Sequence, residues 1–598
     1  MPRLTDLPGI AALLVQVVIG HITMPRRHFT IAQRVDALPL AGAPLLAPIK
    51  IHWNDHLVPF IQAENERDLA VGLGISHAHL RLGQIEFLKY VSQGRLSEIL
   101  GPIANATDHT LRVLDLARVS KECYAAMPEQ SKQWMQGYAD GINYVIANIA
   151  DNRALWPEEF QILNVRPTAW SVEDLLTLAR LNCADFTWGM WPKLLPLRKR
   201  KDWLAVWRHL MNFAGGPPVP AENVLCGDPH LPLALPSFWV LGGLHCPTLK
   251  TVGYMLPGLP AVMVGRSPHI AWGGTSMHAA SSDLFDVATH AENTFTQRSS
   301  VIATRWGRAR EITLTDSRFG PLLTDAPMFN KKTMAVSGSR LAFRWVGHQI
   351  SDEITAMLNV ARARNFDEFQ FALKDFAVAG QNMVYADTEG NIAQLMAARL
   401  PKRATTRPDD VVLKSADHDC WDEMVDTTAL PLRYNPREGF VASANNKPER
   451  DSDVLISCFF SPDDRVARLK SVLGSATKID RELLCSLMTD VKSDSGIVLR
   501  DALLALIDHK QTAVYQCLAD WDGEYRTDSE GALVFEFLLY HFAVALHGKT
   551  DMAVLTVSWD PRSLLLADIA MVPVADLKNA LSLALPKCEK ALKKYRHW

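Results

Sequence analysis

The sequence lacks hydroxyl side chains over a long central stretch. Between Thr187 and Ser237 it has no serine or threonine, and Cys226 is the only thiol. Serine, threonine and cysteine are common nucleophiles of covalent catalysis. Their near absence excludes a hydroxyl nucleophile from this part of the chain and leaves one thiol.

Cysteine pairs and broad fields of positive charge are also missing. The nine cysteines are scattered, odd in number and without any Cys-x-x-Cys pair, which excludes a disulfide framework and a zinc site of the usual spacing. We therefore expect free, buried thiols in a reducing compartment. A net charge of −3 argues against a nucleic-acid partner, because no broad basic surface is available to bind phosphates.

The apolar run nearest the N-terminus, residues 9–22, is too short to span a bilayer as a straight helix and is interrupted by Gln16 and His21. As a signal peptide it lacks a basic start, since Asp6 offsets Arg3, and it lacks a small-x-small cleavage site. A signal and an amphipathic leader both stay open. We expect no stable membrane span and a cytoplasmic location, or a periplasmic one if residues 1–25 act as a signal.

What is present is ordinary globular material arranged in three blocks. The 598 residues are 48% hydrophobic and 21% charged, enough for two to four average domains or one large one. Ser171, with Asp174 three residues on, predicts a capped helix start. Patterning predicts strand and turn over 48–61, helices over 68–101, 108–125, 128–150 and 171–185, strands at 223–226, 239–241, 251–255, 261–264, 270–272, 341–345, 381–386 and 394–397, and helices over 479–491, 497–508, 511–521, 529–547 and 576–595.

Several motifs flank the stretch without hydroxyls. It ends in Gly-Asp-Pro-His-Leu at 227–231, and Pro-Gly-Leu-Pro at 257–260 and Ile-Ala-Trp-Gly at 270–273 follow. The helical block 72–101 contains Gly-Leu-Gly and Gly-Arg-Leu-Ser-Glu, and residues 439–448 read Gly-Phe-Val-Ala-Ser-Ala-Asn-Asn-Lys-Pro. In this order the pieces resemble the penicillin acylase (penicillin amidase) family of N-terminal-nucleophile hydrolases, over roughly residues 45–598.

The resemblance implies a fold and a division of the chain. The expected fold is α+β, a four-layer α/β/β/α sandwich with additional helical wrapping. The expected parts are a leader or arm at 1–45, a region like the family's first chain at 46–190, a shortened linker in place of the family's spacer at 191–216, a β-rich core like its second chain at 217–475, and a truncated helical region at 476–598. In the family's strand and turn near residue 57 a glycine is usual, so Leu57 implies a reshaped turn.

The resemblance also implies a set of site residues. Asn445 matches the family's oxyanion asparagine, Arg465 matches the arginine that orients it, and His230 lies where the family has a residue beside the nucleophile's amine. Asn445 in a plain turn and Arg465 in an ion pair with Asp463 or Asp464 are the alternatives. The nucleophilic serine of the family has no counterpart. Cys226 is the one candidate, and a small buried apolar role in a strand is the favoured interpretation.

No cofactor is predicted. Asp283 matches one calcium-binding aspartate of the family, but Ala280 stands at its partner's position, so we expect the calcium site to be lost or weakened. The pairs His52/His56 and His77/His79 have no third ligand near them in sequence, which disfavours a metal. His77 fits a buried, hydrogen-bonded packing role better than that of a catalytic base.

Two functions fit these observations. In the first, an uncut protein without ordinary amidase activity keeps an acyl-binding cleft and binds its ligand or catalyses a different acyl or carbonyl reaction in specialised-metabolite biosynthesis. In the second, an active amidohydrolase removes the acyl group of a small molecule such as an acyl amino acid, acyl lactone or β-lactam. Both predict an acylated small-molecule partner, and the sequence leaves the oligomeric state open.

Overall fold

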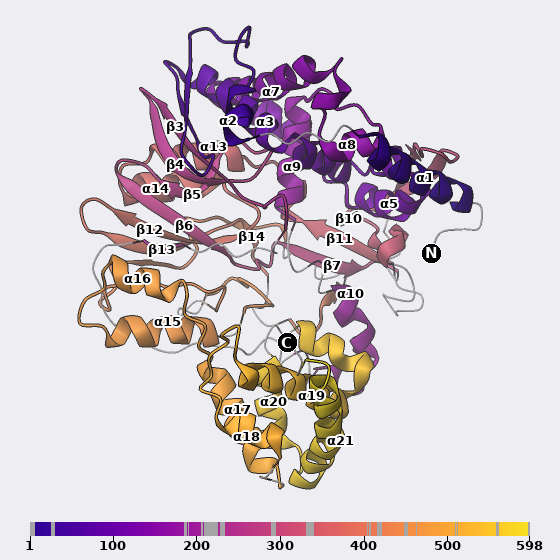
Figure 1. The fold of residues 1–598 in the computed structure, drawn as a ribbon, viewed down its shortest axis with the longest axis vertical. Helices are drawn as coiled ribbons and strands as arrows, with labels where there is room; N and C mark the ends of the chain where they lie inside the picture. Colours follow the sequence, from indigo (N-terminus) through magenta and orange to yellow (C-terminus); the bar gives the residue numbers. More distant parts are fainter. Residues whose placement is uncertain are drawn as a thin grey trace. The chain divides into compact units, whose positions relative to one another are not determined.

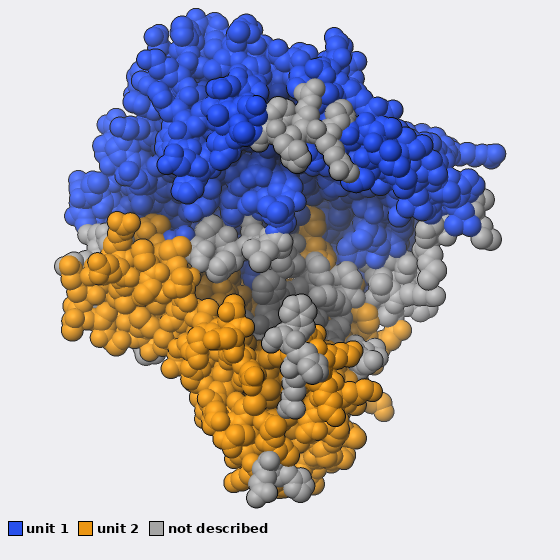
Figure 2. Space-filling view, in the orientation of Figure 1, with its two compact units in different colours: residues 1–186, 227–434, 452–456 blue, residues 187–226, 435–451, 457–598 orange. Residues whose placement is uncertain are grey.

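Helices and strands occupy different parts of the chain. The computed structural model is of mixed α+β class, with helical N-terminal and C-terminal parts and a strand-rich middle (Figure 1). Unit 1 consists of residues 1–186, 227–434 and 452–456, and unit 2 of residues 187–226, 435–451 and 457–598 (Figure 2). The structure describes residues 6–24, 30–184, 188, 191–204, 207, 225–227, 234–288, 295–329, 340–403, 405, 408–414, 421–447, 452–461, 463–508, 510, 512–557 and 561–595, with the backbone alone at 192–193, 549–557, 561 and 563–564.

A nine-stranded sheet is the largest element of unit 1. Its strand order is β1-β2-β3-β4-β5-β6-β12-β13-β17, and neighbours are antiparallel except β2 and β3, where Phe60 pairs with Gly243 in parallel register. The parallel pair joins strands that lie on either side of the N-terminal helical block in the sequence. The bounds are Lys50–Trp53 (β1), Pro59–Gln62 (β2), Val240–Cys246 (β3), Leu249–Met255 (β4), Val262–Arg266 (β5), Ile270–Ser276 (β6), Gln381–Asp387 (β12), Ile392–Ala397 (β13) and Leu432–Tyr434 (β17).

Helices pack against this sheet and against each other. α3 contacts β2 and β3, and α13 contacts β4 and β5. Gly74 of α3 lies against the Tyr138 carbonyl of α7, and Gly141 of α7 lies against the Val71 carbonyl, so a Cβ at either glycine would overlap a backbone oxygen. Unit 1 contains the helices α1 (Leu7–Thr23), α2 (Ile31–Asp36), α3 (Glu66–Ser92), α4 (Ser97–Leu100), α5 (Asn105–Leu114), α6 (Ser120–Ala126), α7 (Glu129–Ile149), α8 (Glu158–Leu163), α9 (Val172–Asn182), α13 (Glu353–Arg362) and α14 (Phe366–Ala372), and the 3₁₀ helix η2 (Gly101–Ala104).

Smaller sheets complete unit 1. β7 (Ser282–Asp286) pairs with β11 (Leu341–Trp345) on one side and in parallel with β15 (Val412–Lys414) on the other. β9 (Arg310–Ser317) lies between β8 (Thr296–Ile302) and β10 (Gly320–Pro321), and β14 (Leu400–Pro401) pairs with β16 (Met424–Val425). Asp283 lies in β7, where its register partner on β11 is Arg344.

The described part of unit 2 is mainly helical. Its helices are α10 (Trp191–Leu194), α15 (Asp464–Ser475), α16 (Arg481–Leu487), α17 (Asp494–Leu506), α18 (Ala513–Ala519), α19 (Glu530–Val557), α20 (Pro561–Met571) and α21 (Val574–Leu592). The segment Glu530–Gly548 is long and apolar enough to cross a membrane by length and composition. However, Phe535, Leu538 and Phe542 are fully buried, and α19 packs against α18 and α21, which is how a core helix behaves.

Several expectations need correction. The single helix expected over 108–125 is two helices, α5 and α6, because Asp115 at the end of α5 takes a left-handed conformation (φ 52°). The strand expected at 223–226 is wrong where the structure describes it, since 225–227 are not in a strand. Leu57 does not reshape its turn. It keeps φ at 57°, while the Asn54 side chain accepts from the backbone amides of His56 (3.0 Å) and Val58 (2.9 Å).

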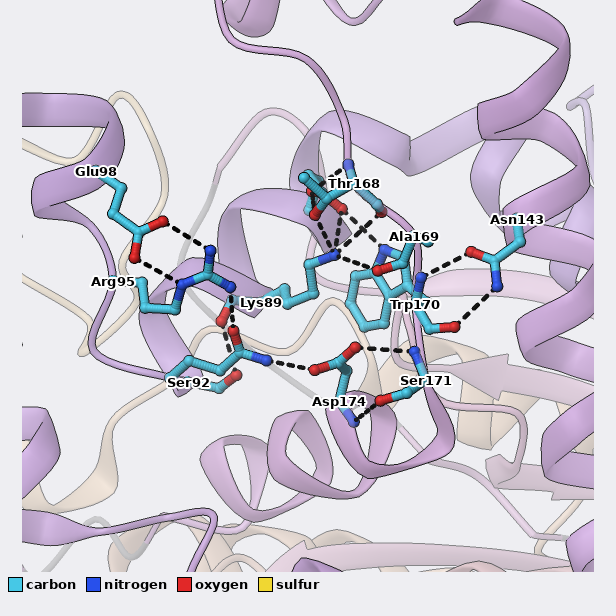
Figure 3. Close-up of polar contacts among 12 residues, drawn as sticks. Lys89, Ser92, Arg95, Glu98, Asn143, Thr168, Ala169, Trp170, Ser171 and Asp174 are labelled. Atoms are coloured by element: carbon cyan, nitrogen blue, oxygen red, sulfur yellow. Dashed lines mark hydrogen bonds and ion pairs between the residues drawn. The ribbon is translucent and has the colours of Figure 1, made fainter. Parts of the chain in front are cut away.

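A buried polar network joins α3 to the segment before α9 (Figure 3). Glu86 is 0% exposed and accepts from Thr168 through Oε1 (amide 2.9 Å, hydroxyl 2.7 Å) and from the Trp170 indole through Oε2 (2.8 Å). The Lys89 ammonium lies 3.3 Å from the same carboxylate and donates to Thr168 Oγ1 at 2.6 Å. Burial lowers the pKa of Lys89, and the charge of Glu86 opposes this shift.

Two more exposed groups of polar residues, at the start of α9 and before and within α4, lie next to this network. Ser171 and Asp174 form the predicted capping box of α9, with Asp174 N donating to Ser171 Oγ at 3.1 Å and Ser171 N donating to Asp174 Oδ2 at 2.8 Å. Arg95 and Glu98 of the Gly-Arg-Leu-Ser-Glu motif pair with each other through two hydrogen bonds, of 2.8 and 2.7 Å. Arg95 also donates to Gln93 Oε1 at 2.8 Å, and the Gln93 amide donates to Asp174, so this part of the motif is linked to the start of α9.

Lys89→Met should destabilise the protein by about 3–5 kcal/mol, because it leaves the Glu86 carboxylate buried without its cation. The double variant Glu86→Gln/Lys89→Met should recover part of this loss, and the surface change Arg95→Met should cost about 1 kcal/mol or less. Urea unfolding of the three variants measures these differences. A cost below 1 kcal/mol for Lys89→Met would show that the pair is not needed for stability.

Candidate functional site

The segment before α15 adopts an irregular turn around Asn445. Asn445 has φ 63°, a left-handed conformation that asparagine tolerates better than most residues. Its carbonyl accepts from the Ser461 amide at 2.8 Å. The buried neighbour Asn446 accepts from the Ala444 amide at 3.1 Å and donates to the Lys447 carbonyl at 2.9 Å. These local bonds fix the backbone on both sides of Asn445.

Arg465, the second residue of α15, reaches back to this turn. Its Nη2 donates to the Ala444 carbonyl at 2.5 Å and to Asn445 Oδ1 at 2.9 Å. Because a guanidinium can only donate, Oδ1 is the acceptor end of the Asn445 amide and Nδ2 is its donor end. Asp464 contacts Arg465 through the backbone amide, at 2.8 Å. The Arg465 side chain thus orients the asparagine and is directed to the turn instead of to Asp464.

The electrostatics of this pair favour a fixed donor. Burial lowers the pKa of Arg465, and the charge of Asp464 opposes that shift. An arginine stays charged in proteins even when its pKa is lowered. A charge-assisted bond to Oδ1 polarises the amide, which strengthens Nδ2 as a donor. An amide donor held in this way is suited to stabilise a negatively charged oxygen.

The other two predicted site residues are His230 and Cys226. His230 lies outside the described residues. Cys226 is exposed, with its thiol 4.0 Å from the Leu484 carbonyl of α16, so the interpretation as a small buried apolar residue in a strand is wrong. The backbone at 225–227 is not paired in a sheet, and this removes the burial that a strand would have given the thiol.

The paired histidines are structural or exposed. His77 is fully buried, its Nδ1 lies 2.7 Å from the Tyr138 hydroxyl, and burial lowers its pKa to about 3. His79 Nε2 lies 2.7 Å from the Arg34 carbonyl, and burial, followed by the charge of Arg34, lowers its pKa to about 4. His52 and His56 are exposed. Among the residues that the structure describes, no group of three or more His, Cys, Asp or Glu is placed to hold a metal ion.

An arginine lies where the family resemblance implies a calcium ion. Arg403, 4% exposed, donates to Asp283 Oδ2 at 3.1 Å (Nε) and 2.8 Å (Nη2), and its Nη2 also donates to the Ala280 carbonyl at 2.8 Å. The Trp421 indole donates to the same carboxylate oxygen at 2.8 Å. Burial raises the pKa of Asp283 and Arg403 opposes this. Calcium needs about six oxygen ligands or more, and a buried guanidinium on its one carboxylate repels it, so these residues do not fit the ion.

No sequence motif indicates that Arg403 lies beside Asp283. Arg403 lies 120 residues from Asp283 in the chain, and nothing in its local motif marks it as a partner. Arg344, the register partner of Asp283, has its guanidinium 5.0 Å from the ring of Trp421. The pairing of β7 with β11 places Arg344 opposite Asp283, and Arg403 reaches the same carboxylate from the segment after β14.

A cavity of about 280 Å³ lies in unit 2, and neither Asn445 nor Arg465 lines it. It is bounded by α19, α20 and α21, and His547 Nε2 lies 2.6 Å from Asp568 Oδ2 at its wall. The remaining lining residues are Ala545, Leu546, Val572, Asp576, Asn579, Ala580 and Leu583. None of the predicted site residues that the structure describes lines this cavity.

Comparison with known proteins identifies the family. The sequence profile described as penicillin amidase matches residues 48–597. The chain belongs to the penicillin amidase family. It is 22% identical over 595 residues to the acyl-homoserine lactone acylase QuiP of Pseudomonas aeruginosa, covering 84% of this chain and 69% of that protein. It is 24% identical over 578 residues to the penicillin acylase 2 proenzyme of Pseudomonas sp. strain SE83, covering 83% and 72%.

Two further relatives are more distant. The penicillin G acylase of Escherichia coli is 21% identical over 569 residues, covering 74% of this chain and 64% of that protein. Among solved structures, the thermostable penicillin G acylase from Alcaligenes faecalis aligns with a TM-score of 0.47 and 20% identity, covering 60% of this chain and 74% of that one.

The calcium prediction is testable on this penicillin amidase family member. Arg403→Met should destabilise unit 1 by about 3–5 kcal/mol, because it leaves a buried carboxylate unpaired. Lys402→Met, next in sequence and half exposed, should cost about 1 kcal/mol or less. Thermal melts of the wild type should be the same in EDTA and in millimolar calcium. A calcium-dependent rise of several degrees in the wild type would contradict the assignment of Arg403.

Proposed function

We propose that the protein acts on N-acylated small molecules, with Asn445 Nδ2 directed at the oxygen of the acyl carbonyl. The observation that carries the proposal is the contact of Arg465 with Asn445 Oδ1, which sets the amide as a donor. Membership of the penicillin amidase family supports the ligand class, since relatives are named acyl-homoserine lactone acylase and penicillin acylase. The proposal takes the fold to be the family's four-layer α/β/β/α sandwich.

The reaction that this arrangement supports is amide hydrolysis. Addition of a nucleophile to the carbonyl carbon places negative charge on the oxygen, and a fixed donor of the oxyanion type stabilises that charge by about 2.7–4 kcal/mol. The C–N bond then breaks, the amine leaves with a proton, and water returns the acyl group as a carboxylic acid. The Cys226 thiol is the nucleophile to test first, because it is exposed and is the only candidate between Thr187 and Ser237.

A shared neighbourhood supports testing Cys226. Its thiol lies beside Leu484 of α16, and Leu484 packs on the cluster of Phe440, Leu473 and Ile479. Ala442, three residues before Asn445, packs on that same cluster. Within unit 2, the thiol and the asparagine turn therefore both border the apolar contacts of α15 and α16.

Acyl binding without hydrolysis is the second candidate. The observation that favours it is the absence of serine and threonine between 187 and 237, where the family places its nucleophile. In this case the protein stays uncut and uses Asn445 to hold or polarise an acyl group for another purpose, such as a step in specialised-metabolite biosynthesis. A cytoplasmic location remains our expectation for both candidates, with a periplasmic one if residues 1–25 act as a signal.

Amine release from an N-acyl-homoserine lactone and from a phenylacetyl anilide separates the two candidates. We expect the purified full chain to release the amine. If the thiol is the nucleophile, Cys226→Ala should lower the rate of release by about a hundredfold or more. Cys485→Ala, which removes another exposed thiol of unit 2, is the matched control. No release by the wild type, together with a single band near 66.5 kDa on a denaturing gel, would reject hydrolysis and favour acyl binding.

A further inference from the structure

The first helix of unit 1 packs with its apolar side outward. The most exposed large apolar side chains of α1 recur at helical spacing: Leu7 (54% exposed), Leu14 (62%), Val15 (57%), Val18 (57%), Ile19 (52%) and Ile22 (76%). Val17, beside this row, is 38% exposed. Ala11 completes this stripe and is also exposed. A surface helix of a globular protein normally places such a stripe toward the core. We call these seven residues the outer stripe.

The opposite side of α1 carries the residues that attach it to the protein. Gly9 and Gly20 are the buried residues of the helix. A Cβ at Gly9 would meet Pro102 of η2 at 2.6 Å, and one at Gly20 would overlap the Ile162 carbonyl of α8. The Gln16 amide donates to that same carbonyl at 2.9 Å. Glycine contacts and a polar side chain thus fix the orientation of α1, and the outer stripe faces away.

Asp6 strengthens the attachment at the start of the helix. Asp6 is buried and forms an ion pair with Arg310 of β9. The only acidic residue before position 36 is therefore neutralised within unit 1. Residues 1–35 contain four arginines and one aspartate, which gives a net charge of +3 in a chain whose total is −3. Two of these arginines, Arg26 and Arg27, lie three and four residues after the end of the helix in sequence.

We propose that α1 is a membrane-surface helix, which lies in the headgroup region of an anionic phospholipid bilayer with the outer stripe in the acyl boundary. A helix of 17 residues is about 25 Å long, shorter than the roughly 30 Å hydrocarbon core, so it lies on the bilayer and does not cross it. Apolar area and flanking arginines are the two attractions that hold such a helix to anionic lipid. This proposal is independent of the acyl site.

Vesicle flotation of the full chain tests the proposal. The wild type should float with vesicles of phosphatidylglycerol and phosphatidylcholine, and more weakly with phosphatidylcholine alone. Leu14→Gln/Val18→Gln/Ile22→Gln should lower the partition coefficient by at least about tenfold, because it removes three apolar side chains from the lipid contact. These side chains are exposed and glutamine favours helix, so the variant should fold.

The matched control places the same change elsewhere. Met571→Gln/Val574→Gln/Leu583→Gln alters three side chains of α20 and α21 that are 74%, 58% and 52% exposed, and it should float like the wild type. Arg26→Gln/Arg27→Gln should weaken binding to anionic vesicles by roughly tenfold and leave binding to neutral vesicles unchanged.

Four results would overturn the proposal. The wild type stays unbound with both kinds of vesicle, or the α1 variant floats as well as the wild type. In the third, light scattering shows a dimer of the wild type and a monomer of the α1 variant, and neither binds vesicles. A second copy of the chain would then cover the outer stripe. Intact-mass measurement accompanies the assay, since removal of residues 1–24 from the mature protein would equally contradict a membrane-surface role.

Discussion

The contact between Arg465 and Asn445 is the constraint on which the functional account depends. The side-chain amide of an asparagine in a left-handed turn can take either orientation unless a hydrogen-bond partner fixes which end donates. The guanidinium does this through Oδ1 and also holds the preceding carbonyl, so that side chain and backbone are fixed by one group. The turn is further held by Ser461 and by Asn446. Fixed donors of this kind act without reorganising during a reaction.

Unit 1 shows a related use of arginine as a permanent cation. At Asp283 the guanidinium of Arg403 satisfies a buried carboxylate and a backbone carbonyl together. A metal ion in such a place supplies charge and fixes ligands, and it can be lost to a chelator. A side chain supplies both functions and cannot be removed. The buried Glu86–Lys89 pair follows the same rule, since every charged atom in it has a partner.

The sequence predicted much of the fold because long helices and strands have strong local periodicity. The α3 block, the α9 capping box and the strand at 341–345 lie where the patterns indicated. Short helices such as α13, α14 and α20 were missed, and the two-residue strands have no periodicity to detect. Leu57 shows the limit of residue-type arguments: the turn keeps a positive φ that costs a leucine about 1–2 kcal/mol, because Asn54 and the flanking strands hold it.

The site was less predictable than the fold. Asn445 and Arg465 were named from a motif resemblance, and their catalytic role remains a prediction, although the contact between them is now seen. Arg403 was missed because its partner lies 120 residues away. The exposure of Cys226 and the outward face of α1 also depend on packing, which periodicity cannot report. In each case the missing information is which distant segment lies against the residue.

The affinity for a non-cleavable acyl ligand, in which CH₂ replaces the amide nitrogen, tests the central claim most directly. Asn445→Gly keeps the left-handed backbone and removes the donor, so calorimetric titration should show binding weakened about fivefold to tenfold, as expected for one hydrogen bond. Asn435→Gly, also at a positive φ (43°), should bind like the wild type. Equal affinity of Asn445→Gly and the wild type, with both proteins equally stable, would contradict the claim that Asn445 contacts the acyl carbonyl.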